Sequence, residues 1–513
     1  MGEEPSSWEM LAAMAVAVVF RACVGLHGYS GEGAPPMYGD FEAQRHWMEV
    51  TVNLPPSGWY VHSADNDMQY WGLDYPPLSA HFSWLVGQSA RLFSHPQLVE
   101  LHRSRGIETM ATRAFMRNSV IVSDVVFFFP VALLCARACS RGRHRQLGFL
   151  VQLLGLPAFM LIDHGHFQYN CVSLGLTLWA MYFCLIGWPV AASVAFSLAL
   201  NFKQMSLYLA PGLFCYLLAG CLRAATFRAR AANVAKLGTA VIATFVVCWL
   251  PFLGDMSSML TVLRRVFPIE RHLFEDKVAN IWCTLSLLPG LKLKTMMPIP
   301  SLVRMTLLAT LGAILPPCAL LLRRPSRLGF VLCTTACGLA FFLCSYQVHE
   351  KHILLPLLPA SLLASRHPLL FCWLSTAASF SLFPLLKRDG QALPYFLLQL
   401  SYLWAGFQLQ RELDGRSIYK EWTLLGRCGL VTSLAAMLAL HLAEATLPPP
   451  ERYPDLHAVA FAAWACAHFV CAYFGILYCQ WRVSLVEQSH TPFDASDKGA
   501  HSLFWWDTHA KVH

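Results

Sequence analysis

Charged residues are scarce in this chain of 513 residues: Asp, Glu, Lys and Arg make up 13% of it, and hydrophobic residues make up 56%. A soluble domain usually carries about 25% charged residues. So few charges cannot cover a surface that faces water, and a soluble globular protein is therefore excluded. The net charge of +8 indicates basic loops on the cytosolic side of a membrane protein rather than a nucleic-acid-binding patch.

The chain lacks a CxxC pair, although it contains 18 cysteines. Nearly all of them lie inside apolar runs, as Cys135, Cys215 and Cys471 do. This placement indicates neither a disulfide framework nor a zinc site. We interpret these cysteines as small residues of membrane helices.

Other features are missing as well. A cleavable signal peptide needs a basic n-region, but Glu3 and Glu4 precede the first apolar run, which predicts an uncleaved first span. No internal repeat or soluble domain is evident. Asp65-Asn66-Asp67 resembles the DxD metal motif of soluble nucleotide-sugar transferases, but the Rossmann-like domain that carries this motif is lacking, and no metal is expected.

Long apolar runs are what the chain has instead. A spanning helix needs about 20 mostly apolar residues, and the sequence predicts an all-α polytopic membrane protein with about fourteen such helices. The predicted spans cover residues 9–26, 117–138, 147–162, 170–187, 188–201, 204–222, 237–253, 301–322, 328–345, 353–365, 368–386, 393–410, 423–446 and 456–480.

The basic residues predict the orientation of these spans, because Lys and Arg collect in cytosolic loops. Four clusters fall on one face if the spans alternate, and both termini then lie in the cytosol. The clusters are Arg141, Arg143 and Arg145; Arg223, Arg228, Arg230 and Lys236; Arg323, Arg324 and Arg327; and Arg411, Arg416 and Lys420.

The opposite face receives the unusual polar segments of what we predict to be a single membrane-embedded domain, residues 1–513. A first loop on this non-cytosolic face, residues 27–116, should contain interfacial helices. A second loop on the same face, residues 254–300, carries cationic residues against the usual rule, which makes them candidates for function. These are Arg264, Arg265, Arg271 and Lys277.

The first polar constellation is Gly39-Asp40-Phe41-Glu42-Ala43-Gln44-Arg45-His46-Trp47. A carboxylate just outside a membrane helix, such as Asp40, can act as a general base if a proton donor lies within reach. An aspartate at this position is equally typical of a helix N-cap. The residues alone leave both interpretations open.

The second constellation is Tyr70-Trp71-Gly72-Leu73-Asp74-Tyr75-Pro76-Pro77. Aromatic rings beside a carboxylate suit sugar faces and hydroxyl groups, but Trp and Tyr are also enriched at membrane interfaces. On the residues alone, the interface is the better interpretation.

The third set is cationic and comes from three separate predicted loops. Lys203 follows the fifth span, His349-Glu350-Lys351-His352 lies between two spans, and His164, His166 and Gln168 lie in Asp163–Asn170. HEKH lacks the HExxH spacing that places two histidines on one helical face for a metal. On its own, HEKH is as typical of a polar loop without function as of a phosphate site, but three cationic segments on one face of the membrane favour phosphate.

These motifs resemble a known family. Residues 39–47, Trp59-Tyr60, Gln69–Leu78, His166–Asn170, Asn201–Gln204, Arg265–Pro268 and His349–His352 are similar to the endoplasmic-reticulum glucosyltransferases that use dolichyl-phosphate glucose to extend the lipid-linked N-glycan precursor. The first loop matches the member that adds the first glucose, with its GD-[FY]-EAQRHW and QYWGLDYPP patterns. The alternative is the sister enzyme that adds the second glucose, whose loop starts with a TDFE-type motif.

The resemblance implies a glycosyltransferase-C fold, a membrane helical bundle with luminal loop helices over the active site. It also implies an inverting transfer of glucose from dolichyl-phosphate glucose to the terminal mannose of dolichyl-diphosphate Man9GlcNAc2, in α-1,3 linkage. The expected partners are these two lipid substrates and the endoplasmic-reticulum membrane. No cofactor, metal or nucleic acid is expected. A transporter or lipid flippase is the rival class, but polar groups clustered at one membrane face favour an enzyme.

The resemblance also assigns the site residues. Asp40 aligns with the family's catalytic base. We expect the substrates to be bound by Glu42, Trp71, Asp74, Tyr75, Gln168, Lys203, Arg271, His349, Lys351 and His352. Glu42 and Asp74 would orient sugar hydroxyls or the loop, and the cations would stabilise the leaving phosphate.

Overall fold

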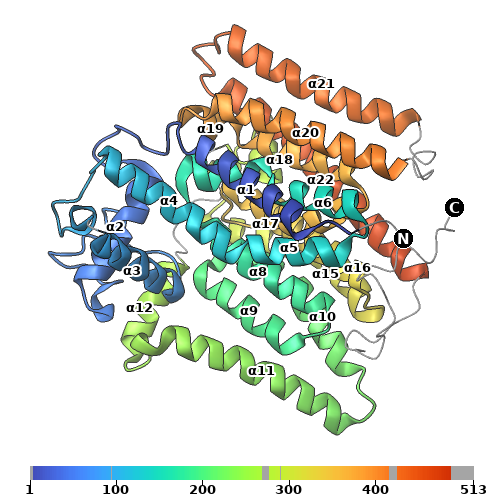
Figure 1. Ribbon diagram of the computed structural model, residues 1–513, viewed down its shortest axis with the longest axis horizontal. Coiled ribbons are helices and arrows are strands. Elements are labelled where there is room, and N and C mark those ends of the chain that lie inside the picture. Colours follow the sequence, from blue (N-terminus) through green and yellow to red (C-terminus); the bar gives the residue numbers. More distant parts are fainter. Residues whose placement is uncertain (1–3, 94, 268–276, 289–290, 415–423, 487–513) are drawn as a thin grey trace.

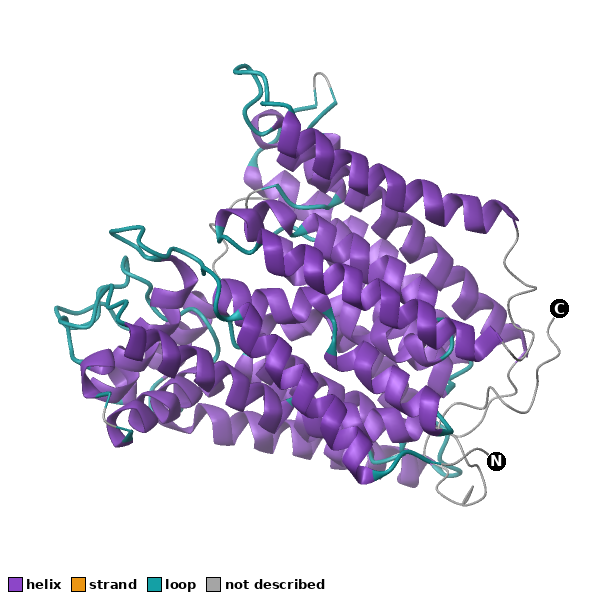
Figure 2. Cartoon of the chain, turned by 45° about the horizontal axis from the view of Figure 1, so that its top comes forward, coloured by secondary structure: helices purple, strands orange, loops and turns teal. Residues whose placement is uncertain are grey.

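In the computed structural model, every regular element of the described chain is a helix. The structure describes residues 4–93, 95–267, 277–288, 291–414 and 424–486. Figure 2 shows these helices packed into one bundle with loops at its ends. The prediction of an all-α membrane protein with loop helices is thereby confirmed.

Nine helical segments in the described residues are long and apolar enough to cross a membrane. They are Ser7–Val24 (α1), Met110–Cys139 (α4 and α5), Arg143–Phe167 (α6, α7 and η3), Gln204–Leu222 (η4 and α10), Phe227–Phe252 (α11 and η5), Ile299–Arg323 (α15), Arg327–Cys344 (α16), Cys428–Thr446 (within α21, Leu424–Thr446) and Leu456–Leu485 (within α22, Leu456–Val486). Three shorter apolar helices accompany them: Asn170–Leu185 (α8), Pro189–Phe202 (α9) and Pro368–Ser381 (α18).

Two further predicted spans coincide with helices that do not have the length or apolarity of a span. Residues 353–365 form the short helices α17 (Leu354–Ser361) and η7 (Leu362–Ser365), and residues 393–410 lie in the more polar α20 (Ala392–Asp414). The fourteen predicted segments are thus all helical in the described residues, while a count of fourteen spans stays a prediction.

The bundle has a clear inside and outside. Helix α16 lies at its centre, with 83% of its most apolar stretch buried, whereas α11 and α21 lie at the periphery with 11% buried. Valine and leucine side chains such as Val247 and Leu442 are exposed on these outer helices, as expected where lipid tails are the solvent. Figure 1 shows α11 and α21 on opposite sides of the bundle.

The shorter helices α2 (Gly39–Asn53), α3 (Pro77–Leu92) and α12 (Met256–Val266) gather at one end of the bundle (Figure 1). Pro77 starts α3 because a proline is tolerated in a first helical turn. Two of the basic clusters meet elsewhere, where Arg223 Nη2 donates to the Arg323 carbonyl at 3.4 Å. Two of the predicted basic clusters are thus neighbours in the structure, while the orientation of the spans in a membrane stays a prediction.

Candidate active site

A tight loop before α2 positions Asp40. Gly31 and Gly39 both have positive φ angles, 77° and 64°. A Cβ atom at either position would lie within 2.5 Å of backbone atoms in the facing segment of the loop. Glycine adopts such angles without steric cost. The Ser30 amide donates to the His166 carbonyl at 3.1 Å, and the Asp40 amide donates to Ser30 Oγ at 3.2 Å. The loop is thereby docked beside His166.

The Asp40 carboxylate receives three donors from other segments. Lys351 Nζ lies 2.6 Å from Oδ2 and His166 Nε2 lies 3.1 Å from the same oxygen, while Gln168 Nε2 also donates to it. The N-cap position of α2 is Tyr38, and no side chain caps this helix. The N-cap interpretation of Asp40 is therefore wrong.

Burial alone would raise the pKa of Asp40, but the nearby charges of Lys351 and His166, with their hydrogen bonds, outweigh it and hold this pKa well below its usual range. The carboxylate is consequently ionised at neutral pH. About a fifth of the side chain, 21%, stays exposed, so a substrate hydroxyl can reach it.

A polar chain runs from Asp40 to Lys203. Lys203 Nζ donates to Gln168 Oε1 at 3.3 Å and to Asn170 Oδ1 at 2.6 Å. Burial, and then the charge of Lys351, lower the pKa of Lys203. Two ammonium groups therefore lie close enough to repel each other, an arrangement that an anion between them would relieve.

The segment between α16 and α17 forms the short helix η6 (Glu350–Ile353), and its two histidines are neutral. Burial, followed by the charges of Lys203 and Lys351, lowers the pKa of His352 to about 3. Burial and the charge of Lys351 likewise hold the pKa of His349 well below its usual value. His352 Nδ1 accepts from the His349 amide at 3.2 Å. The positive charge of this segment thus comes from Lys351, not from its histidines.

Asp40 stands at the edge of a cavity of about 800 Å³. Its wall is formed by the loop before α2, by η6 and by the end of α19 (Phe383–Arg388). The acidic and basic side chains on this wall are Glu32, Asp40, His166, His349, Glu350, Lys351, Arg388 and Asp389. This volume and polarity suit sugar rings with their hydroxyl groups.

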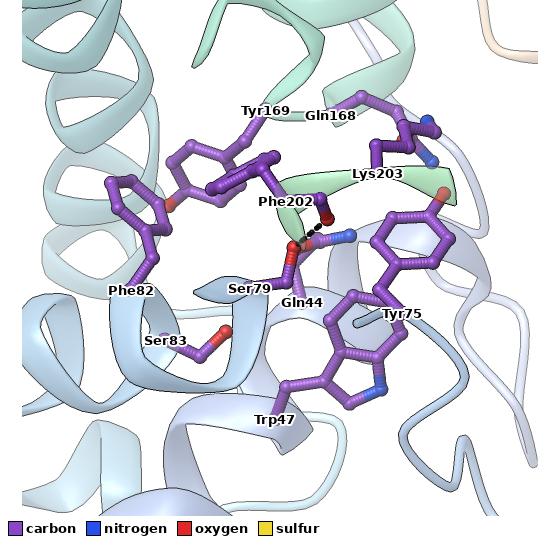
Figure 3. Close-up of a pocket in the computed structure, with 10 residues that line it drawn as sticks. All are labelled: Gln44, Trp47, Tyr75, Ser79, Phe82, Ser83, Gln168, Tyr169, Phe202 and Lys203. Carbon is purple, nitrogen blue, oxygen red and sulfur yellow. Dashed lines mark hydrogen bonds between the residues drawn. The ribbon is translucent and has the colours of Figure 1, made fainter. Parts of the chain in front are cut away.

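A second, smaller pocket lies beside Lys203 and Gln168 (Figure 3). Tyr75 stands against Lys203, whose Nζ lies 4.8 Å from the centre of the tyrosine ring. Phe82 and Phe202 form its apolar side, with ring centres 5.3 Å apart. The pocket therefore joins a cationic head to an apolar wall.

The structure does not bring Glu42 to either cavity. Its carboxylate pairs with Arg45 at 2.6 and 2.7 Å and accepts from the Tyr70 hydroxyl at 2.8 Å, and its side chain is 1% exposed. Of the two predicted roles for Glu42, these contacts support orientation of the loop.

The aromatic motif also supports the loop. Trp71 Nε1 donates to the Met37 carbonyl at 2.5 Å, and Trp47 Nε1 donates to the Trp71 carbonyl at 2.8 Å. Arg265, one of the cations placed against the topological rule, donates to the carbonyls of Gly72 and Leu73 at 2.9 and 3.1 Å. It thereby anchors the segment that carries Asp74.

Asp74 lies near the second pocket through its backbone, because Gln204 Nε2 donates to its carbonyl at 3.2 Å. Its charge acts on Lys203 and on Tyr60. His164 points elsewhere: its Nε2 lies 3.0 Å from Asp124 Oδ2, which also pairs with Arg21. Arg271 lies outside the described residues.

The structure adds Asp389, which the sequence analysis missed. Asp389 Oδ2 lies 2.6 Å from His166 Nδ1, and the side chain is 7% exposed. The turn after it is held by Gln391 Nε2, which donates to the Gly28 carbonyl at 2.5 Å. The polar break Lys387-Arg388-Asp389-Gly390 between two apolar runs, on the predicted luminal face, was the available signal.

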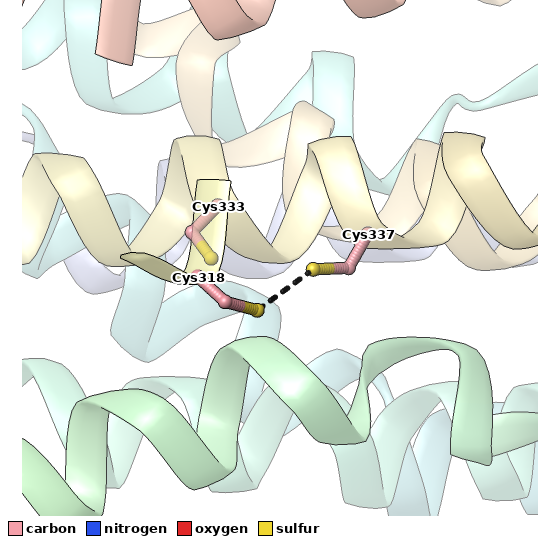
Figure 4. A group of neighbouring side chains, drawn as sticks. All are labelled: Cys318, Cys333 and Cys337. Carbon is pink, nitrogen blue, oxygen red and sulfur yellow. Dashed lines mark hydrogen bonds between the residues drawn. The ribbon is translucent and has the colours of Figure 1, made fainter. Parts of the chain in front are cut away.

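One group of side chains in the described part of the chain has the spacing of metal ligands: Cys318, Cys333 and Cys337, whose sulfur atoms all lie within 4.8 Å of one another. Figure 4 shows them where α15 and α16 meet, with Cys318 Sγ 3.7 Å from Cys337 Sγ. They line neither cavity, and they are free thiols.

The fold and this site define a polytopic membrane protein with a carboxylate-centred polar site enclosed at one end of its helical bundle. Residues 17–475 match the ALG6, ALG8 glycosyltransferase family, and the chain belongs to that family. The predicted family and enzyme class are thereby confirmed.

Curated relatives resemble the chain over nearly its whole length. It is 40% identical to the dolichyl pyrophosphate Man9GlcNAc2 alpha-1,3-glucosyltransferase of Gallus gallus, covering 92% of this chain and 96% of that protein. It is 42% identical to the probable enzyme of the same name of Arabidopsis thaliana, covering 94% and 90%. Among solved structures, ArnT from Cupriavidus metallidurans bound to undecaprenyl phosphate is similar at 14% identity and a TM-score of 0.41, covering 93% of this chain and 77% of ArnT; at this level the likeness carries no information about the site.

Proposed function

We propose that this protein transfers glucose from dolichyl-phosphate glucose to the terminal mannose of dolichyl-diphosphate Man9GlcNAc2, forming an α-1,3 linkage. The observation that carries the proposal is the placement of Asp40, an ionised carboxylate at the edge of a cavity of about 800 Å³, in a chain about 40% identical to enzymes named for this transfer. The glycosyltransferase family argues against the transporter alternative.

The reaction proceeds by inversion in this proposal. The acceptor hydroxyl oxygen attacks the anomeric carbon from the face opposite the phosphate, and the bond from that carbon to the phosphate oxygen breaks through an oxocarbenium-like transition state. Asp40 takes the hydroxyl proton. The electron pair leaves with dolichyl phosphate, whose growing negative charge needs fixed positive charge nearby.

Lys203 and Lys351 supply that charge. They lie at the two ends of the polar chain Lys351–Asp40–Gln168–Lys203, and the charge of Lys351 bears on the buried Lys203. A phosphate between them would remove their mutual repulsion. Neutral His349 and His352 would contribute hydrogen bonds instead of charge, while Tyr75 and the phenylalanines of the smaller pocket would contact the donor.

Purified protein in lipid vesicles, given synthetic dolichyl-phosphate glucose, tests the proposal. We expect glucose to be added to a lipid-linked Man9GlcNAc2 acceptor. Transfer only to an acceptor that already carries one glucose would instead identify the sister activity. Absence of transfer from this donor, with transfer from a nucleotide sugar, would overturn the donor assignment.

Substitution of Lys203 by methionine should impair donor use more than acceptor use. Loss of a charge-assisted contact of about 1.5–3 kcal/mol predicts a fall of roughly 10- to 100-fold in kcat/KM for the donor. Initial rates over a range of donor concentrations measure this. Lys236→Met, on the exposed side of α11, is the matched control; equal kinetics in both variants would remove Lys203 from the phosphate site.

The proposed setting is the endoplasmic-reticulum membrane, with the site luminal and both termini cytosolic. The basic clusters opposite the loop helices support this orientation. Glycosylation acceptor sequences inserted near Asp65 and fused to the C-terminus test it. Modification at the first position alone is the expected result, and modification at the C-terminus would contradict the orientation.

A further inference from the structure

Asp163 lies where the chain turns into α8, and it is connected to the active site through Asn170. It belongs to the π-helical turn η3 (Leu161–Phe167) and is 2% exposed. Its Oδ1 accepts from the Asn170 amide at 3.2 Å and from Asn170 Nδ2 at 2.7 Å, and its Oδ2 accepts from the Cys171 amide at 2.5 Å. Asp163 thereby caps α8 from the preceding segment and holds the side chain of Asn170.

The side-chain amide of Asn170 has an acceptor facing one end and a donor facing the other. Its nitrogen faces Asp163 Oδ1, and its oxygen accepts from Lys203 Nζ at 2.6 Å. An ammonium group is a donor only, and a carboxyl oxygen that meets two N–H groups is an acceptor. An amide turned over would place two donors against each other at Lys203 and two acceptors at Asp163. Asp163 thus fixes which atom of Asn170 meets Lys203.

The second acceptor of Lys203 comes from Gln168. Its Oε1 lies 3.3 Å from Lys203 Nζ, and its Nε2 donates to Asp40. An ammonium carries three N–H bonds, so acceptors at two of them set the direction of the third. Lys203 faces the smaller pocket beside Tyr75 (Figure 3). The third bond can then donate to a phosphate oxygen in that pocket.

We propose that Asp163 is a positioning residue for the donor phosphate, which acts through Asn170 to aim the ammonium of Lys203 into the smaller pocket. This inference rests on the proposed function, in which Lys203 contacts that phosphate. It gives a role to a buried carboxylate that lines neither of the two cavities. A π-helical turn is rare and often lies at a functional site; here it brings Asp163 against Asn170, seven positions later in the chain.

A helix cap is the alternative role of Asp163, since its oxygens also receive the first amides of α8. Loss of a cap lowers stability, but it does not affect one substrate more than the other. Loss of positioning turns the Asn170 amide over and removes an acceptor from Lys203, which weakens phosphate binding in particular. The two roles therefore separate in the use of the donor relative to the acceptor.

Asp163→Asn is the first test. The new amide oxygen can still accept from the Cys171 amide, but the new amide nitrogen faces Asn170 Nδ2, so the Asn170 amide turns over and presents its nitrogen to Lys203. We expect kcat/KM for the donor to fall about 10-fold while KM for the acceptor is nearly unchanged. Ser326→Ala, which removes the N-cap of α16, should lower the thermal transition without changing donor use. An equal loss for both substrates in Asp163→Asn would overturn the positioning role.

Asp163→Asn combined with Asn170→Asp exchanges the two side chains. In this double variant the amide nitrogen at position 163 donates to the carboxylate at position 170, whose other oxygen accepts from Lys203. We expect kcat/KM for the donor to return to within about threefold of the parent. A folded double variant that uses the donor no better than Asp163→Asn would contradict the inference.

A measurement without turnover keeps this test separate from that of the proposed function. Binding of dolichyl phosphate to the protein in lipid nanodiscs should be about 10-fold weaker in Asp163→Asn and should recover in the double variant. Unchanged binding in Asp163→Asn would overturn the inference. A parent protein that binds dolichyl phosphate, with the expected weakening in Asp163→Asn, but transfers no glucose would overturn the proposed function alone.

Discussion

Asp40→Asn is expected to reduce glucosyl transfer by about 10²- to 10⁴-fold, because it removes the proton acceptor while keeping the shape of the side chain. The loss should appear in kcat, with KM for the donor nearly unchanged, since Lys203 and the smaller pocket remain. Single-turnover assays with radiolabelled donor measure the chemical step directly. The thermal transition of the purified variant serves as the control for folding.

The low pKa of Asp40 also predicts that protonation of this carboxylate does not limit transfer by the parent enzyme near neutral pH. Burial would raise this pKa, but the charges of Lys351 and His166 hold it well below the usual value, which is about 3.9. A depressed carboxyl pKa adds stability that is complete above the usual value and is lost as the pH falls through the folded value. Between about pH 5 and 8, the range around physiological pH, Asp40 therefore stays ionised. Transfer by Asp40→Asn within about threefold of the parent would contradict its role as base.

Hydropathy and loop charge predicted much of this arrangement. Alternating spans placed the segments around Asp40, Gln168, Lys203 and Lys351 on one face, and the structure brings all four into one polar chain. The prediction succeeds because spans that cross a bilayer restrict each loop to one of two ends. Convergence at an end then needs only lateral packing of the helices.

The sequence could not predict which side chains touch each other within the site, for two physical reasons. Neighbours in sequence diverge on a helix, since successive residues turn by about 100°; Asp40 and Glu42 therefore face different surroundings. Partners far apart in sequence converge through packing that hydropathy does not encode: Asp389 reaches His166 across 223 positions. The motifs that carry the resemblance end at His349–His352 and gave no reason to select a residue in the apolar C-terminal part.

The second large effect concerns the buried hydrogen-bond network that contains Glu42 and keeps its carboxylate away from both cavities. Arg45 is the hub of this network, with a side chain that is 0% exposed. It binds Glu42 at 2.6 Å, Glu49 at 2.7 Å and Ser104 Oγ at 2.5 Å, and it donates to the Leu98 carbonyl at 3.0 Å. These bonds tie α2, which carries Asp40, to the segment after α3.

Arg45→Met should destabilise the protein by about 3–5 kcal/mol, because it leaves the carboxylates of Glu42 and Glu49 buried without their cation. A lower thermal transition in detergent, with faster proteolysis of the first loop, would record this loss. Methionine keeps much of the apolar volume, so the effect reports the charge and its hydrogen bonds. An unchanged transition would show that the network contributes little to folding.

Glu42→Gln separates the two roles considered for that residue. If Glu42 orients the loop, the Glu42→Gln variant has a lower thermal transition and a lower kcat, because Asp40 is less well placed, while KM for the acceptor is nearly unchanged.

In Arg45→Met, the added Glu42→Gln change should recover part of the lost stability, because it removes one of the two uncompensated carboxylates. A raised acceptor KM with an unchanged thermal transition would instead return Glu42 to the sugar site. Coupling between positions 42 and 45 therefore decides whether this part of the motif holds the loop that presents Asp40 or touches the substrate itself.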